Sequence, residues 1–172
     1  VVNNVKVIGV TRRAKYGIIQ FDNHYSVVFH LGMSGRIIIE RNKFKSLQKH
    51  DHVSMELIEQ NNIKAKVRFI FRDPRRFGFF NIYQNKDSSY KNIFKNLGPE
   101  PLHKSFSVKN FYKKIHKKKS SIKVLLLNQS IISGLGNIYV CESLFLAKIS
   151  PFTLGFNLTL KDIFYLYSKI EE

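Results

Sequence analysis

The sequence predicts an α+β protein in which an antiparallel β-sandwich is followed by a helical domain. Up to about residue 96 the chain is a series of short runs rich in β-branched and aromatic residues, with polar turn residues between them. After Leu97 the apolar residues recur at helical spacing instead. We therefore divide the 172 residues into a β-domain, residues 1–96, and a helical domain, residues 97–172.

Seven runs in the first part are expected to be strands. They are Val5–Val10, Gly17–Phe21, Tyr25–His30, Arg36–Glu40, His52–Glu59, Lys64–Phe71 and Phe77–Tyr83. Asp22-Asn23 and Asn61-Asn62 are short polar pairs that tolerate a left-handed backbone, so each is expected to join two runs in a hairpin. Such hairpins are compatible with an antiparallel sandwich or barrel, and the sandwich is the form we predict.

The second part is expected to be helical. Phe106, Phe111 and Ile115 are spaced to share one side of a first helix, and Ser107 can cap it. Two further helices are expected at Ile122–Asn128 and Ile138–Ala147. Thr159, with an aspartate three residues later, has the pattern of an N-cap that begins a last helix.

The charge of the chain indicates a polyanionic partner. The formal net charge is +17, from 29 Lys and Arg against 12 Asp and Glu, and nucleic acid is the leading candidate. An AT-rich gene also enriches lysine, which accounts for part of the excess. An acidic membrane surface is the other alternative, but no apolar stretch is long enough to span a bilayer and the start lacks a signal-peptide pattern. We expect a cytoplasmic protein without membrane contact.

Two local features bear on ligands. Cys141 is the single cysteine, and without a Cys or His cluster at ligand spacing it predicts neither a disulfide nor a metal site. The basic run over residues 113–119 is either a solvated face or a contact with phosphate.

Two segments offer side chains suited to reading bases. Met33 lies in a glycine-flanked turn at a strand end, where it is either an exposed apolar wedge or folded into the core. Arg75 and Phe77 are two residues apart after Asp73-Pro74, so in an extended segment they would project to the same side. A cation beside a ring suits a base pair, and the alternative is a surface arginine beside a core phenylalanine.

Two other segments suit phosphate. Gly134-Leu135-Gly136-Asn137 precedes an apolar helix, so it is an anion cradle or simply a turn. Lys15 is close to Arg12 and Arg13, whose charge is expected to lower its pKa. It is a phosphate ligand, an amine that takes part in catalysis, or a solvated lysine.

In this order, these segments resemble formamidopyrimidine-DNA glycosylases, bacterial enzymes that excise oxidised purines from DNA. The segments are Arg12–Tyr16, His30–Gly35, Asp73–Gly78 and Gly134–Tyr139, and the resemblance also includes residues 49–53, 97–102, 122–123 and 142–145. It implies a β-sandwich followed by a helix-two-turn-helix domain, and base-excision repair with associated AP lyase strand cleavage. The implied partner is double-stranded DNA with an oxidised purine, such as 8-oxoguanine or a formamidopyrimidine, or an abasic site. We expect a nucleoid-associated monomer.

The resemblance also assigns roles to individual residues. Those expected to fill the gap left by a flipped base and engage the orphaned partner are Met33, Arg75 and Phe77. Those expected to contact DNA are Lys15, His50, Arg75, Lys123 and Asn137. Lys15 is in addition the residue that could assist catalysis.

The sequence departs from the family pattern at both ends. The family attacks the sugar with the amine of an N-terminal proline, followed by a glutamate, whereas this chain starts with Val1. The four-cysteine finger that holds Zn²⁺ in the family has no counterpart here, so no cofactor is expected in this chain. The sequence is a piece of a normal enzyme or the product of a decayed gene, and the coherent interior favours the piece. We expect little glycosylase activity from this polypeptide, and the alternative function is a non-catalytic damaged-DNA or RNA-binding protein.

Overall fold

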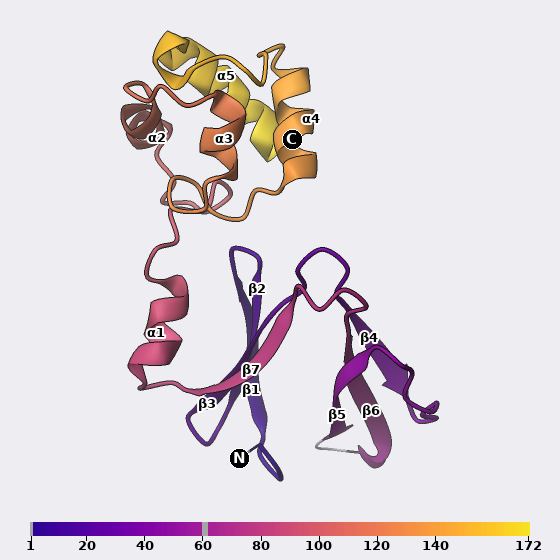
Figure 1. Cartoon of the computed structure of the whole chain (residues 1–172). Helices are drawn as coiled ribbons and strands as arrows, with labels where there is room; N and C mark the ends of the chain where they lie inside the picture. The colour runs from indigo at the N-terminus through magenta and orange to yellow at the C-terminus, as the bar shows by residue number, and fades with distance from the viewer. Residues whose placement is uncertain (1, 60–61) are drawn as a thin grey trace. The chain divides into compact units, whose positions relative to one another are not determined.

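The computed structural model describes residues 2–59 and 62–172, which form two compact units. The first unit ends at Tyr90 and holds the β-structure, and the second is Lys91–Glu172 and is helical (Figure 1). The predicted α+β class, with antiparallel sheets preceding helices, is confirmed. The contacts divide the chain inside helix α1, Ser88–Phe94, whereas the sequence placed the domain boundary near Leu97.

The first unit is a sandwich of two antiparallel sheets. Its strands are β1 (Val7–Arg13), β2 (Tyr16–Phe21), β3 (Tyr25–His30), β4 (Arg36–Arg41), β5 (Asp51–Glu59), β6 (Asn62–Arg72) and β7 (Phe79–Gln84). One sheet has the order β1-β2-β3-β7 and the other β4-β6-β5. Aromatic rings join the sheets, since Phe69 of β6 lies 5.9 Å from Phe29 and 5.8 Å from Phe80, centroid to centroid. Their burial supplies the hydrophobic free energy that holds the layers together.

Several local features differ from the expectations or leave them open. Strand β1 is Val7–Arg13 rather than Val5–Val10, and β7 begins at Phe79, which leaves Phe77 in a loop. The left-handed residue of the β2–β3 hairpin is His24, with φ 64°, the residue after the predicted Asp22-Asn23 pair. Helix α1 was not expected, because it buries no residue and so has no apolar periodicity. Of the turn expected at Asn61-Asn62, residue 61 lies outside the described ranges and Asn62 is the first residue of β6, so the turn stays a prediction.

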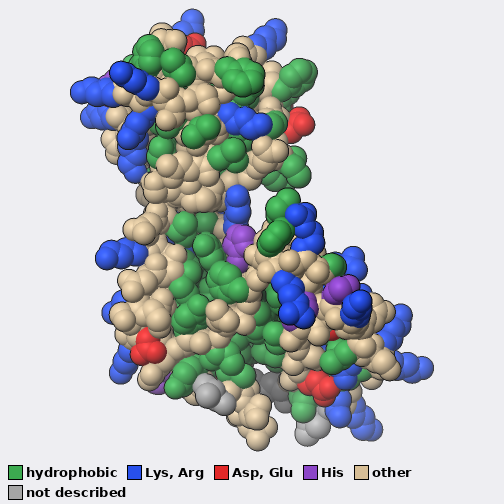
Figure 2. All heavy atoms as spheres, viewed as in Figure 1, with side chains coloured by type: hydrophobic (Ala, Val, Ile, Leu, Met, Phe, Trp, Pro, Cys, Tyr) green, Lys and Arg blue, Asp and Glu red, His purple; other side chains and the backbone are tan. Residues whose placement is uncertain are grey.

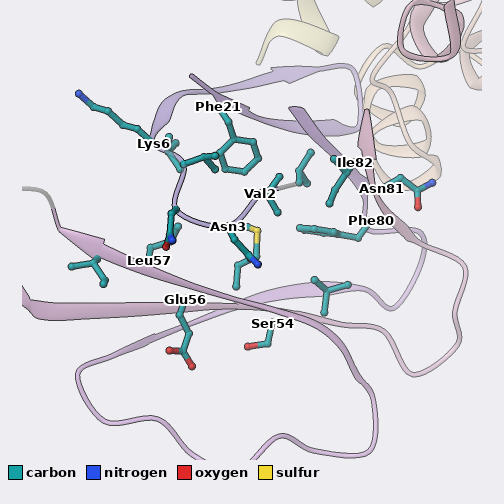
Figure 3. Close-up of a pocket in the computed structure, with 17 residues that line it drawn as sticks. Val2, Asn3, Lys6, Phe21, Ser54, Glu56, Leu57, Phe80, Asn81 and Ile82 are labelled. Atoms are coloured by element: carbon teal, nitrogen blue, oxygen red, sulfur yellow. The ribbon is translucent and has the colours of Figure 1, made fainter. Parts of the chain in front are cut away.

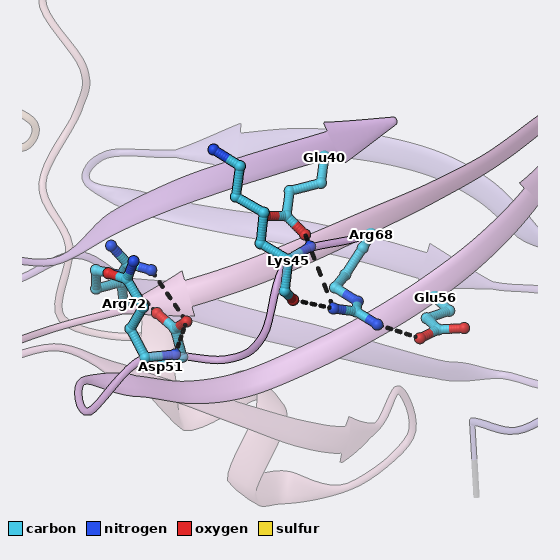
Figure 4. Close-up of polar contacts among 7 residues, drawn as sticks. Glu40, Lys45, Asp51, Glu56, Arg68 and Arg72 are labelled. Atoms are coloured by element: carbon cyan, nitrogen blue, oxygen red, sulfur yellow. Dashed lines mark hydrogen bonds and ion pairs between the residues drawn. The ribbon is translucent and has the colours of Figure 1, made fainter. Parts of the chain in front are cut away.

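Charged side chains stabilise the three-stranded sheet. Arg68 of β6 donates to Glu56 of β5 at 2.9 Å and to the carbonyl of Lys45 at 3.0 Å, and it lies 3.8 Å from Glu40 of β4 (Figure 4). Its guanidinium also stacks on Phe44, 4.2 Å from the ring centroid. One arginine thus links both edge strands to the central strand of this sheet.

The helical unit has one continuous core. Its main helices are α2 (Val108–Ile115), α3 (Ile122–Leu127), α4 (Asn137–Leu146) and α5 (Leu160–Glu171), with a 3₁₀ turn η1 at Gly155–Asn157. Ile115, Ile122, Val140 and Ile163, one from each helix, are completely buried in this core. The predicted caps are confirmed: Ser107 accepts from the Asn110 amide, and Thr159 forms a reciprocal capping box at the start of α5.

Candidate nucleic-acid interface

Three loops leave the same end of the four-stranded sheet. Tyr16 at the start of β2 pairs with His30 at the end of β3, and His30 pairs with Phe79 at the start of β7. The β1–β2 turn at residues 14–15, the β3–β4 loop and the β6–β7 loop therefore emerge together (Figure 1). Predicted site residues Lys15, Met33, Arg75 and Phe77 lie on these loops. A cavity of about 1080 Å³, lined by residues such as Val2, Phe21 and Ile82, opens at the opposite end of the sandwich (Figure 3).

The β3–β4 and β6–β7 loops are in backbone contact. Gly32 has φ 62°, and a Cβ atom there would lie 2.6 Å from both the Gly78 nitrogen and the Phe77 carbonyl carbon. The Gly35 amide closes the β3–β4 loop by donating to the Leu31 carbonyl at 2.8 Å. A side chain at position 32 would force the loops apart, so glycine is required by both conformation and space.

A buried carboxylate holds the two loops together. Asp73 is completely buried and accepts hydrogen bonds from Ser34 Oγ at 2.6 Å and from the Gly78 amide at 2.7 Å. Ser34 Oγ in turn accepts from the Arg75 amide at 3.2 Å. The hydrogen bond from Ser34, with the Gly78 amide next, keeps the pKa of Asp73 below its usual value. The carboxylate is thus ionised at neutral pH and fixes both loops at once.

We call the hydrogen-bonded group of Ser34, Asp73 and Gly78 the clamp, and the side chains on the two loops that it joins are exposed. Met33 is 75% exposed and Phe77 is 58% exposed, which excludes the alternatives that placed either residue in the core. The Arg75 guanidinium carbon lies 4.6 Å from the centroid of the Phe77 ring. The expected pairing of cation and ring is therefore present, but the segment is not extended as predicted: Arg76 has φ 57°, so a turn brings the side chains together.

Lys15 borders the same group of loops. Its side chain is largely exposed, yet burial of the remainder lowers its pKa, so the predicted direction holds while the predicted cause, the charge of Arg12 and Arg13, is wrong. Burial, followed by the charge of Lys15, also lowers the pKa of His30. His30 is therefore neutral at pH 7, and its Nδ1 accepts from the Gly32 amide at 3.0 Å. His30 therefore lies between Lys15 of the β1–β2 turn and the β3–β4 loop that carries Met33.

His50 is brought to the β6–β7 loop by its backbone. Its carbonyl accepts from the Asp73 amide at 3.1 Å, and His52 Nε2 lies 2.8 Å from the Asp73 carbonyl oxygen. Asp51, between these two histidines, forms an ion pair with Arg72 (Figure 4). The hydrogen bond from Arg72 is the main reason that the pKa of the Asp51 carboxyl is lowered. The start of β5 is therefore held against the end of β6 and the first residue of the β6–β7 loop.

In the helical unit, Gln129 shapes the glycine segment before α4. Its Oε1 accepts from the Gly134 amide at 2.9 Å, and its Nε2 donates to the carbonyls of Leu127 at 3.1 Å and Leu135 at 2.9 Å. Gly134 has φ 98°, a conformation that favours glycine. One amide side chain therefore sets the path of the backbone into α4.

The N-terminus of α4 is open to ligands. Gly136 is the N-cap and supplies no side-chain cap, while Asn137, Ile138 and Tyr139 of the first turn are all exposed. A helix begun in this way presents backbone N–H groups and a partial positive charge, which suits phosphate. Lys123 lies beside the next turn of α4, where it and Cys141 line a cavity of about 460 Å³. The structure therefore brings Lys123 near the helix whose first residue is Asn137.

Three residues that shape the loops of the two units were not predicted. Ser34, Asp73 and Gln129 hold loops rather than contact a ligand, and a sequence pattern for binding does not single them out. The available signal was weak: Asp73 precedes a proline and is followed by two arginines, an arrangement that also fits a solvated turn.

Comparison with known families decides the assignment. Residues 1–80 match the formamidopyrimidine-DNA glycosylase N-terminal domain, and residues 97–172 match the H2TH domain of the same family. The chain belongs to the formamidopyrimidine-DNA glycosylase family. A formamidopyrimidine-DNA glycosylase of Rickettsia felis is 42% identical over 172 residues, covering 99% of this chain, and one of Haemophilus influenzae strain PittEE is 40% identical over 170 residues. The chain spans 59% of the length of these two relatives.

Solved structures of formamidopyrimidine-DNA glycosylases have the same fold. The Lactococcus lactis enzyme, non-covalently bound to DNA containing an AP site, superposes with a TM-score of 0.84 at 32% identity, over 96% of this chain and 61% of that chain. A structure of MutM in complex with DNA containing carbocyclic 8-oxo-G gives a TM-score of 0.83 at 32% identity, over 96% of this chain and 59% of that one. The fold of both units is therefore that of the family.

Within residues 2–59 and 62–172, no three His, Cys, Asp or Glu side chains are grouped so that they could hold a metal ion. No helix there is long and apolar enough to cross a membrane.

Proposed function

We propose that this chain recognises oxidised purines and abasic sites in duplex DNA, in base-excision repair. The observation that carries the proposal is the exposed set of Met33, Arg75 and Phe77 on two loops fixed by one buried carboxylate. Support comes from relatives solved with DNA that contains an AP site or 8-oxo-G.

The chemistry of the three side chains suits a gap in a base stack. A flipped or missing base leaves an apolar space, which Met33 fills as a flexible wedge. The Arg75 guanidinium can donate to an exposed base edge while the Phe77 ring stacks beside it. Lys15, Asn137 and the α4 N-terminus then contact phosphates, with His50 and Lys123 as further contacts.

We further infer that the full-length protein is a DNA glycosylase with AP lyase activity and that these 172 residues alone excise bases poorly. Imine formation needs a positioned, deprotonated amine. Lys15 is the lysine of the described chain whose pKa is lowered, and it lies beside His30. A primary amine of this kind, largely solvated, makes a weak nucleophile.

Binding to matched duplexes tests the recognition step. Fluorescence anisotropy would compare a duplex with a tetrahydrofuran abasic analogue, one with 8-oxoguanine and an undamaged one. Met33→Ala and Phe77→Ala should each reduce the preference for damaged duplex by about 10-fold or more, because burial of such a side chain is worth about 1.5–3 kcal/mol. Leu47→Ala removes an apolar side chain that is 54% exposed outside these loops and should leave the preference unchanged.

Equal losses on damaged and undamaged duplex would contradict the wedge. No preference for damaged duplex in the unsubstituted chain would favour the alternative, a general nucleic-acid or RNA-binding protein.

Borohydride trapping on the abasic duplex tests the chemistry separately. We expect little covalent adduct from the 172-residue chain, and any adduct should map to an amine such as that of Lys15. Efficient release of 8-oxoguanine by this polypeptide would overturn the inference of weak activity.

A further inference from the structure

The helical unit carries a basic surface that the lesion-reading loops do not use. From Pro101 to Lys161 the chain has ten lysines and a single acidic residue, Glu142. Phe111 and Ile115 turn one face of α2 into the core, which leaves Lys109, Lys113 and Lys114 exposed on the rest of the helix. Lysine side chains gather on the α2 side of this unit, at its left in Figure 2.

The loop after α2 is fixed against the loop before η1. The backbone hydrogen bonds that join them run from the Phe156 amide to the Lys118 carbonyl at 3.2 Å, from the Gly155 amide to the Ser120 carbonyl at 3.0 Å, and from the Ile122 amide to the Thr153 carbonyl at 2.7 Å. Ser121 and Leu154 form an antiparallel bridge between them. The two segments therefore lie side by side in a defined register.

This register places Lys118 beside Phe156 at one end of the paired segments, and it places Phe152 level with Ile122 and Lys123 at the other end. Lys117, Lys118 and Lys119 are all exposed, and Lys118 is hydrogen-bonded through its backbone to Phe156. Phe156 is 50% exposed, and Phe152, four residues earlier, is 83% exposed. We call these five residues the basic-aromatic strip. Within the described residues no carboxylate forms an ion pair with the three lysines.

We propose that the basic-aromatic strip binds single-stranded nucleic acid. Lysines attract phosphates without regard to sequence, and exposed rings offer surfaces on which unpaired bases stack. A duplex would satisfy only the lysines, because its bases are already stacked and paired.

The strip suits a nucleic acid better than a membrane. Membrane binding of this kind depends on a continuous apolar face, usually on an amphipathic helix, whereas here two rings are separated by Thr153, Leu154 and Gly155 on a loop. The proposal goes beyond lesion recognition and does not depend on it. In a repair protein such a site would hold a displaced or unpaired strand.

Binding of a fluorescent oligothymidylate of about 15 nucleotides, a length in the range of known single-strand sites, tests the proposal. The double variant Phe152→Ala/Phe156→Ala should weaken binding roughly 10-fold or more, because each stacked base is worth about 1–3 kcal/mol. The triple variant Lys117→Gln/Lys118→Gln/Lys119→Gln should reduce the slope of log K against log salt concentration by about 2, at about 0.7 for each phosphate contact.

Matched controls remove the same groups elsewhere. Phe164→Ala removes a ring of α5 that is 45% exposed, and Lys86→Gln/Lys91→Gln/Lys95→Gln removes three exposed lysines outside the strip. Neither control should change oligothymidylate affinity by more than about 2-fold. Photocrosslinking of the unsubstituted chain to an oligonucleotide with 5-iodouracil gives a readout that does not depend on any variant, and the crosslinks should map to residues 117–119 and 152–156.

Several results would overturn the proposal. Equal weakening by strip and control variants, or crosslinks outside these residues, would do so. So would an equal loss of undamaged duplex binding in the strip variants, or strip-dependent binding to phosphatidylserine vesicles without oligothymidylate binding. Met33→Ala should leave oligothymidylate binding intact, so failure of this site and failure of lesion recognition are separate outcomes.

Discussion

Removing one hydroxyl should disconnect the loops that carry Met33 and the Arg75–Phe77 pair. Ser34 Oγ donates to the buried Asp73 carboxylate at 2.6 Å and accepts from the Arg75 amide at 3.2 Å, so Ser34→Ala deletes both hydrogen bonds. It adds no bulk. Any loss of function would therefore come from loop order rather than from a steric clash.

The expected cost can be worked from these two bonds. A hydrogen bond to a charged group is worth about 1.5–3 kcal/mol, and the one from the Arg75 amide about 0.5 kcal/mol or less, because water can replace its acceptor at the surface. We expect the β-unit to lose about 2–3 kcal/mol of unfolding free energy. For a unit of this size that lowers its melting temperature by roughly 10–20 °C.

Two measurements check this prediction. Thermal unfolding followed by far-UV circular dichroism reports the stability, and anisotropy with damaged and undamaged duplex reports the preference for damage, which should fall about 10-fold. Ser54→Ala, in which an exposed serine of β5 is replaced, is the control. A Ser34→Ala protein that unfolds like the unsubstituted chain, or that keeps its preference for damaged duplex, would show that the hydrogen bonds of Ser34 do not hold the two loops together.

Three other changes have defined outcomes. Gly32→Ala places a Cβ atom 2.6 Å from the Gly78 nitrogen on a backbone with φ 62°, so it should cost about 1–2 kcal/mol of unfolding free energy in backbone strain alone and separate the two loops. Thermal unfolding and the preference for damaged duplex would reveal both effects. An unaffected protein would mean that the loops are not in contact. Gln129→Ala leaves the Gly134 amide without its acceptor, so duplex affinity should fall about 10-fold for damaged and undamaged DNA alike. A loss confined to damaged DNA would contradict phosphate binding by the glycine segment before α4. Folding raises the pKa of Tyr167 to about 12, mainly through burial and then the hydrogen bond to Glu171, so the stabilisation is complete below pH 10 and is lost as the pH rises to about 12. Tyr167→Phe should flatten the alkaline fall in helical-unit stability measured by circular dichroism, and an unchanged fall would assign it to other groups.

Met33, Arg75 and Phe77 show how far sequence reasoning reached. A glycine on each side of Met33 and the spacing of Arg75 and Phe77 were enough to predict an apolar side chain and a cation–ring pair at strand ends. Their exposure could not be derived, because a methionine or phenylalanine gains the same burial energy in a core as in a stacked base pair. The turn through Arg76 was also beyond prediction, since non-glycine residues rarely adopt a positive φ without a tertiary constraint.

The electrostatic effect on Lys15 was predicted in direction but not in cause. The pKa of Lys15 is lowered as expected, but by burial of part of its side chain, a quantity that depends on which loops pack against the β1–β2 turn. Asp73 was named only as the residue before Pro74, whereas its role depends on a serine 39 positions earlier in the chain.

The sequence by itself determined the strand and helix periods, the division into β-structure and helices, the caps at Ser107 and Thr159, and the segments that place the chain in its family. These features depend on neighbouring residues, so local chemistry is sufficient to predict them. Only the tertiary structure decided which loops meet at one end of the sheet, that Asp73 clamps them, and that Lys118 lies beside Phe156. Each of these is a contact between residues far apart in the chain, and no local propensity encodes it.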